Sequence, residues 1–183
     1  MQASLANVAR RTGLNAGRQA TVAMPQVMRG VHTEAKLEKL GYTLPQVAKP
    51  KGSYQLCVRS GNQMFTAGHL PQPAGGDLIL GKVGLDLSVE EANKAAQYCA
   101  LSILATLKAE IGDLDRIVRV VKVVGFVNCT DGFAQQPQVI NGASDLFAEV
   151  LGERGMHSRS AVGTNALPLN VPVEVEAIIE ISE

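Results

Sequence analysis

Hydrophobic and polar positions alternate near the C-terminal end of the chain. Valine, alanine and isoleucine occupy every second position of residues 171–181. The positions between them hold Pro172, Glu174, Glu176, Ile178 and Glu180. A period of two predicts a β-strand with one apolar face and one face that carries carboxylates. Residues 159–162 also predict a strand, and a turn-rich connection at residues 165–170 separates the two strands.

The pairing of these two strands decides what lies beside Arg159. If they pair as a hairpin, Arg159 comes near Glu174 or Glu176. A fixed guanidinium beside a carboxylate can bind a small carboxylic acid and handle a proton at the same place. A cross-strand salt bridge on a sheet face is the alternative, and on spacing alone it is the more common arrangement.

The N-terminal half of the folded region predicts a helical turn and a hairpin. Residues 34–50 fit a short helix followed by an extended segment that contains prolines. Residues 54–59 and 63–67 predict two strands about a turn at residues 60–62. A Gly/Pro-rich loop follows, and residues 78–80 could add a short strand.

Two helices and a long strand follow in the middle of the chain. Ser88 and Glu91 have the spacing of a capping box, and apolar residues behind them repeat every three or four positions until Gly112. Residues 117–127 are nearly all β-branched, which favours a strand inside a sheet. A second amphipathic helix opens at Pro137 and ends at Gly152.

The order of these elements predicts an α+β fold, a mixed sheet with both helices packed on one face. The second face of that sheet would still carry valine, isoleucine and glycine. Such a face is too apolar to be left in water, so we expect an oligomer in which sheet closes against sheet.

Composition places limits on the class of protein. At 183 residues with 46% hydrophobic residues, the chain suits one domain of ordinary size. No apolar stretch approaches the roughly 20 residues of a membrane-spanning helix, so we expect no membrane partner. The three cysteines and three histidines have no metal-binding or disulfide spacing. Buried free thiols in a reducing compartment are therefore expected.

The first 33 residues differ in composition from the rest. They contain four arginines and no acidic residue, with scattered serine and threonine, which is typical of an organellar transit peptide. We therefore expect residues 1–33 to be a transit peptide and residues 34–183 to be one domain. The expected location is the mitochondrial matrix, with a plastid as an alternative, and mature protein starting near residues 30–34. A disordered extension without an address, on a cytoplasmic protein, is the other possibility.

Three strings of the sequence resemble one known family. They are GSYQLCVRSGNQMFTAGHLP at residues 52–71, VVGFVNCTDGFAQQPQVINGASDLFAEVLG at residues 123–152, and SRSAVGTNALPLNVPVEVEAIIEI at residues 158–181. In this order they resemble the Rid (reactive intermediate deaminase) family, also called YjgF-like and formerly named endoribonuclease L-PSP. The similarity runs from about residue 37 to residue 180.

This resemblance implies a fold and a reaction. The fold is chorismate-mutase-like (YjgF-like), assembled as a homotrimer with clefts between subunits. The reaction is the hydrolysis of enamines and imines, such as 2-aminoacrylate and 2-imino acids, to 2-keto acids and ammonia. The family uses no cofactor and no metal.

The resemblance also implies roles for particular residues. Arg159 matches the arginine that binds the substrate carboxylate, and Glu176 matches the glutamate that positions water and handles protons. Tyr54 matches a tyrosine near the cleft. Asn141 matches an asparagine that faces the site from the second helix, and Gly68 matches a small residue before the cleft-lining loop.

Two positions depart from the family pattern. Ala161 stands where active members often have cysteine, so only its backbone could line the pocket. His69 stands where many relatives have glutamine. It could change substrate preference, or it could simply hydrogen-bond a loop, which is the more ordinary role.

Two other functions remain open at this stage. One is a non-catalytic module that binds a small carboxylate or a protein partner. The other is an endoribonuclease, after the older family name. Without its first 33 residues the chain has 13 basic and 17 acidic residues, a net charge of −4. It also lacks a basic stripe, so nucleic acid is not an expected partner.

Overall fold

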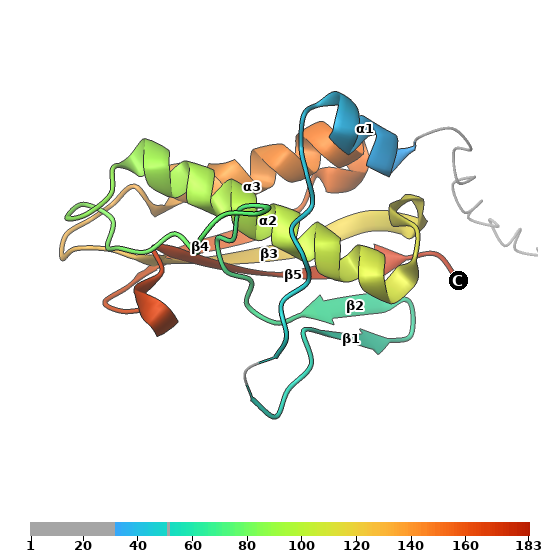
Figure 1. Cartoon of the computed structure of the whole chain (residues 1–183), viewed down its shortest axis with the longest axis horizontal. Coiled ribbons are helices and arrows are strands. Elements are labelled where there is room, and N and C mark those ends of the chain that lie inside the picture. The colour runs from blue at the N-terminus through green and yellow to red at the C-terminus, as the bar shows by residue number, and fades with distance from the viewer. Residues whose placement is uncertain (1–31, 51) are drawn as a thin grey trace, which may run out of the picture.

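The computed structural model describes residues 32–50 and 52–183. Three helices and five strands make up the domain, with short 3₁₀ turns between some of them. The helices are α1 (Thr33–Lys39), α2 (Val89–Ile111) and α3 (Gln136–Leu151). The strands are β1 (Cys57–Ser60), β2 (Gln63–Thr66), β3 (Ile117–Asn128), β4 (Ser158–Thr164) and β5 (Val173–Ile181). Helices α2 and α3 lie on the same side of the sheet, as predicted (Figure 1).

The helix ends follow the chemistry of their terminal residues. The backbone N–H of Glu91 donates to Ser88 Oγ at 3.2 Å, and the N–H of Ser88 donates to Glu91 Oε2 at 2.8 Å. This reciprocal capping box confirms the predicted start of α2. Gly112 and Gly152 end α2 and α3 at φ angles of 80° and 63°, which glycine adopts without steric cost.

The sheet order corrects the predicted hairpin. The strands run β1-β2-β5-β3-β4, and every pair is antiparallel except β3 with β4. Strands β4 and β5 are therefore not neighbours, because β3 lies between them. The reason is the connection through α3, which carries the chain back over the sheet and sets β4 parallel to β3. Residues 78–80, which could have formed a short strand, are loop in the structure.

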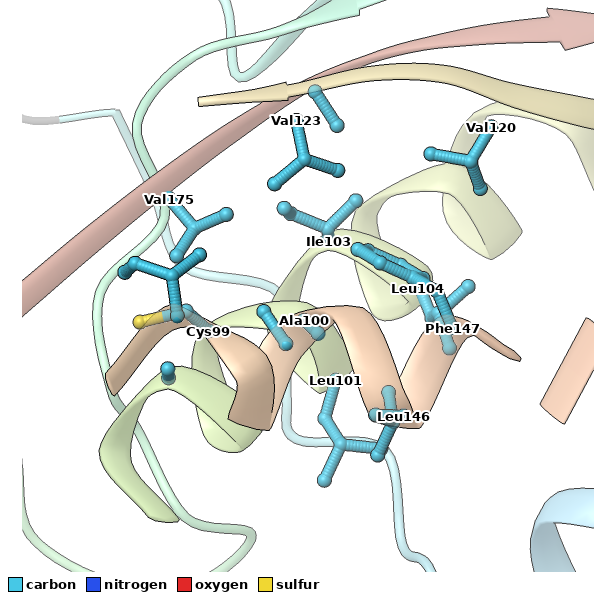
Figure 2. Close-up of a cluster of buried hydrophobic side chains, with 14 of the residues drawn as sticks. Cys99, Ala100, Leu101, Ile103, Leu104, Val120, Val123, Leu146, Phe147 and Val175 are labelled. Carbon is cyan, nitrogen blue, oxygen red and sulfur yellow. The ribbon is translucent and has the colours of Figure 1, made fainter. Parts of the chain in front are cut away.

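The core is aliphatic and lies between the helices and one face of the sheet. Figure 2 shows Val120 and Val123 of β3 and Val175 of β5 near residues of the two long helices. Phe147 on α3 is fully buried, among alanine, leucine, isoleucine and valine side chains. This dry layer means that the two faces of the sheet are separate environments.

The opposite face, here called the open face, is partly apolar and exposed. Pairing places Phe65 beside Val58 and Ile178, and Val162 on the same face. Val58, Phe65 and Val162 are 53%, 39% and 45% exposed. The predicted apolar second face is therefore present. Within the described ranges, no helix is long and apolar enough to cross a membrane.

Helix α1 begins at Thr33, the last residue of the predicted extension. Thr33 is buried, and its N–H and hydroxyl both donate to Asp115 Oδ1, at 2.9 and 2.6 Å. Arg154 also donates to the Thr33 hydroxyl at 3.2 Å. Thr33 therefore belongs to α1 rather than to the extension. Residues 1–31 of the predicted transit peptide lie outside the described residues.

The two long helices approach each other closely at Gly142. A Cβ atom there would lie 1.9 Å from the backbone oxygen of Asn93, whose side chain also donates to the carbonyl of Gln138 at 2.8 Å. We predict that Gly142→Ala lowers the free energy of unfolding by about 1–3 kcal/mol, because overpacking outweighs the gain in helix propensity. Gln138→Ala, at an exposed position of the same helix, should change it little. Urea unfolding of both variants measures this, and a Gly142→Ala protein as stable as the parent would contradict the packing.

Candidate functional site

Arg159 and Glu176 face opposite sides of the sheet. Arg159 is in register with Val123 of β3, and Val123 is fully buried under the helices. Glu176 is in register with Val124, the next residue, which faces the other way. The expectation that a hairpin of these two strands would bring Arg159 near Glu174 or Glu176 is therefore wrong, because β3 lies between β4 and β5. The cleft between subunits that the resemblance implies does not depend on that hairpin.

The Arg159 guanidinium is fixed against the N-terminal half of α3. Its Nη1 donates to Asn141 Oδ1 at 2.9 Å and to Ser144 Oγ at 3.0 Å, and Nη2 donates to the Pro137 carbonyl at 3.3 Å. The structure thus brings Asn141 beside Arg159, two residues that the resemblance assigned to one site. The three acceptors are all neutral.

Arg159 also has no carboxylate within salt-bridge distance among residues 32–50 and 52–183. The cross-strand salt bridge that spacing alone favoured is therefore not formed. A guanidinium that is held in place but not neutralised is suited to binding an anion.

A surface pocket of about 240 Å³ adjoins this guanidinium. Its lining comes from α3, from β4 and from the residue pair before β4: Ser144, Asp145, Ala148, Met156, His157 and Arg159. Neither Ser144 nor His157 was among the site residues expected from the sequence. A signal was present, because His157 and Arg159 are two apart on one strand face, and Ser144 follows Asn141 by three helical positions.

Glu176 lines a smaller pocket of about 120 Å³ on the open face. Phe65, Val124 and Ile178 supply apolar walls, and Lys122 lines the same pocket. The Lys122 ammonium donates to Ser160 Oγ at 2.9 Å. This pocket therefore combines a carboxylate, a cation and apolar surface.

Glu174 lies beside Glu176 on the open face and covers Gly68. A Cβ atom at position 68 would lie 1.7 Å from Glu174 Oε1, so glycine is what lets the carboxylate rest against the backbone there. Burial raises the pKa of Glu174, and the charge of Glu176 raises it further. Gly68 thus lies at the open face, as a residue of a site around Glu176 would.

The other predicted site residues are more dispersed. Tyr54 lies before β1 and not within it. Its side chain is 49% exposed. Ala161 is in register with Gly125 on the helix side of the sheet and packs against the core. It therefore shares a face with Arg159 and not with Glu176.

His69 is a buried structural residue. Its Nδ1 lies 2.7 Å from the Ala67 carbonyl and its Nε2 lies 2.8 Å from Thr106 Oγ1 on α2. Burial lowers the pKa of the imidazole. Of the two roles considered for His69, loop hydrogen bonding agrees with these contacts.

One group of carboxylates could be mistaken for a metal site. In the described part of the chain, ligand atoms of Glu34, Asp113 and Asp115 lie within 4.8 Å of one another. Each carboxylate already accepts from the protein: Glu34 from the N–H of Leu114, Asp113 from that of Asp115, and Asp115 from Thr33. Turn capping therefore accounts for this cluster.

The raised pKa of Glu174 predicts a pH-dependent change in stability. The folded protein holds this proton more tightly than the unfolded chain, so stability falls as pH rises above the ordinary glutamate pKa. Glu174→Gln removes that loss. We expect the variant to melt above the parent at pH 7, with the difference shrinking toward pH 4. Glu180→Gln, on the same face, is the control, and thermal unfolding at several pH values is the measurement. A difference that does not depend on pH would contradict the assignment.

Comparison with known proteins agrees with this fold. The family model described as "YjgF/chorismate_mutase-like, putative endoribonuclease" matches residues 34–181. Protein TCP17 of Trypanosoma cruzi is 44% identical over 149 residues, 81% of this chain and 93% of that protein. A RutC family protein of Pyrococcus abyssi is 30% identical over 71% of this chain and 87% of its own length.

A solved structure extends the comparison to three dimensions. The protein Atu1372 of Agrobacterium tumefaciens, whose function is described as unknown, is 45% identical. It superposes with a TM-score of 0.76 over 82% of this chain and 94% of its own. The matched region is the domain whose sheet, helices and pockets are described above, and the chain belongs to the YjgF/Rid family.

Proposed function

We propose that this protein hydrolyses 2-imino and 2-enamino acids to 2-keto acids and ammonia. The observation that carries the proposal is the Arg159 guanidinium, held by three neutral acceptors and left without a carboxylate partner in the described residues. A 2-imino acid carries a carboxylate next to its C=N carbon. Binding the carboxylate by two N–H groups orients that carbon toward a water molecule.

Glu176 has the properties of the residue that positions this water. It borders a pocket with apolar walls, and the neighbouring Glu174 adds negative charge. The water oxygen attacks the C=N carbon while Glu176 accepts a proton, which gives a carbinolamine. Glu176 returns that proton to the amino nitrogen and takes up the hydroxyl proton as the C–N bond breaks, so that ammonia leaves and the C=O bond of the keto acid forms. An iminium carbon is already electrophilic, so general base catalysis of modest strength suffices.

The opposite orientation of Arg159 and Glu176 constrains the assembly. If both act on one small substrate, they must come from different subunits. We therefore propose a homotrimer in which the β4 edge of one subunit meets the open face of the next, and each interface forms one cleft. The exposed Val58, Phe65 and Val162 on the open face support burial against a second subunit.

A non-catalytic role in binding a small carboxylate is the second candidate. Ala161 favours it, because any thiol chemistry at that position is absent. Both candidates use Arg159 in the same way, and they differ only in whether bound imine is turned over. Neither requires a cofactor.

Kinetics of single variants test the role of each residue. The decay of enzymatically generated 2-iminopropanoate is followed with the parent and the variants. Arg159→Ala should lose about 2–5 kcal/mol of substrate binding and orientation, and Arg159→Lys should recover little because the planar fork is lost. Glu176→Gln should lower kcat more than it raises KM. Arg119→Ala and Glu180→Gln are the matched controls.

These kinetics can also refute the proposal. If folded Arg159→Ala protein hydrolyses 2-iminopropanoate at the parent rate, the assignment of this site fails. If the parent itself does not accelerate the decay, the binding role replaces catalysis.

Mixed oligomers test whether the site lies between subunits. Arg159→Ala and Glu176→Gln chains are unfolded together and refolded as a mixture. In a cyclic trimer, each mixed assembly regains one interface with both parental residues, so about a quarter of the parent activity should return on random mixing. Each variant refolded alone should keep only the low activity that it shows without mixing. No recovery from a mixture shown to contain mixed trimers would indicate that the residues do not act across an interface.

We also propose that the first residues direct the protein to the mitochondrial matrix. The arginine-rich, acid-free composition of residues 1–33 supports this, and the burial of Thr33 favours a mature protein that retains it. A C-terminally tagged full-length chain should reach mitochondria with its N-terminus near residues 30–34. Replacing the four arginines by glutamine should prevent import. A cytosolic protein that retains Met1 would contradict the proposal.

A further inference from the structure

Three hydrogen bonds in series connect residues that line or adjoin the pocket beside Arg159. His157 Nδ1 lies 2.6 Å from the Gly155 carbonyl oxygen, and His157 Nε2 lies 3.0 Å from Ser144 Oγ. Arg159 Nη1 donates to the same Ser144 oxygen at 3.0 Å. Ser144, His157 and Arg159 all line the 240 Å³ pocket. These bonds form a relay, Gly155–His157–Ser144–Arg159, that connects a titratable ring to the guanidinium through one hydroxyl.

The direction of each proton in this relay follows from its partners. The Gly155 carbonyl can only accept, so Nδ1 carries a proton. Arg159 can only donate, so the Ser144 oxygen accepts from it. When His157 is neutral, its Nε2 has a free lone pair, and the single Ser144 proton points to that nitrogen. In this state the hydroxyl offers no proton to the pocket.

Protonation of His157 reverses the role of Ser144. The imidazolium carries a proton on Nε2 and must donate it, and the Ser144 oxygen has two lone pairs to accept from both His157 and Arg159. The serine proton is then free to turn toward the pocket. The same event adds a second positive charge beside Arg159. A carboxylate in the pocket would gain one more hydrogen bond and one more favourable charge.

The surroundings of His157 favour its neutral form. Burial lowers the pKa of His157 and the Arg159 charge lowers it further, against the opposing effect of the Gly155 carbonyl. The edge of the ring faces Phe147 of α3 at a centroid distance of 6.0 Å, which supplies no charge. Asp145, also on α3, is the other titratable side chain of the pocket. An anion bound at Arg159 would offset the repulsion between the two cations.

We propose that Ser144 is a second donor to the carboxylate held by Arg159, and that His157 controls it by taking up a proton as the carboxylate binds. Ser144 is thus a binding residue and His157 a positioning residue. The inference rests on the proposed function for its ligand class, a small 2-imino or 2-keto acid. It adds that affinity for this acid rises as the pH falls through the titration range of His157.

Binding of pyruvate to the full-length protein tests the relay. Pyruvate is a stable 2-keto acid, and calorimetry in buffers of different ionisation enthalpy counts the protons taken up. We expect uptake of a fraction of one proton near pH 6.5, and an affinity that increases up to about tenfold per pH unit as pH falls, the limit for one linked proton. Methyl pyruvate, which lacks the carboxylate, should neither bind nor shift the His157 resonances in an NMR titration.

Three variants separate the roles. His157→Gln can still hydrogen-bond Ser144 but does not titrate, so its affinity for pyruvate should not change over the pH range in which that of the parent does. Ser144→Ala removes the second donor and should bind less tightly at low pH. Asp145→Asn should keep the pH dependence, and His32→Gln, at an exposed site before α1, should match the parent.

The outcomes distinguish this inference from the proposed function. No pyruvate binding by the parent, no linked proton uptake, or an unchanged pH dependence in folded His157→Gln would overturn the relay. In each of those cases the proposed function would still stand, provided that Arg159→Ala loses imine hydrolysis. Linked proton uptake in a protein that does not accelerate imine decay would support the relay and refute the deaminase.

Discussion

The parallel pairing of β4 with β3 is the constraint on which the rest of the site depends. Helix α3 leaves the end of β3, crosses the face of the sheet and returns the chain to run beside β3 in the same direction. This connection sets the register of Arg159 against Val123 and so turns its side chain toward α3. It also leaves the other edge of β3 to β5, whose glutamates then face away from the helices.

One consequence is that the sheet separates the charges of the domain. On the helix side, Arg159 is surrounded by neutral hydrogen-bond acceptors at the outer edge of a dry aliphatic core. On the open face, Glu174 and Glu176 lie close enough to raise the pKa of Glu174. Neither group neutralises the other, because a layer of β-branched side chains and backbone lies between them. A small substrate could meet both only where two copies of the chain adjoin.

The core explains why such a site can be held rigidly. Gly142 lets α2 and α3 approach to backbone contact, and α3 then presents Asn141 and Ser144 to the arginine. These residues sit on a regular helix rather than on a loop. A guanidinium fixed in this way loses little conformational entropy when it binds a carboxylate, which favours tight and oriented binding. The adjoining His157 ties the same hydroxyl to a group that titrates.

Much of the local structure followed from the sequence. The capping box at Ser88, the glycines at 112 and 152 and the period of two in β5 act through neighbouring residues, so each predicted its element. The layout of helices on one sheet face followed from the same patterns. The weak strand signal at residues 78–80 had no partner strand to stabilise it, and it was wrong.

The sequence by itself therefore determined most of the elements and the family, because these depend on short-range periodicity and on the similarity of local strings. Only the tertiary structure decided which side of the sheet each residue faces. Strand neighbours are chosen by crossover geometry and by burial over the whole sheet, which no local pattern encodes. That is why the sequence suggested a hairpin that would bring Arg159 near Glu174 or Glu176, although the sheet turns Arg159 and Glu176 to opposite faces.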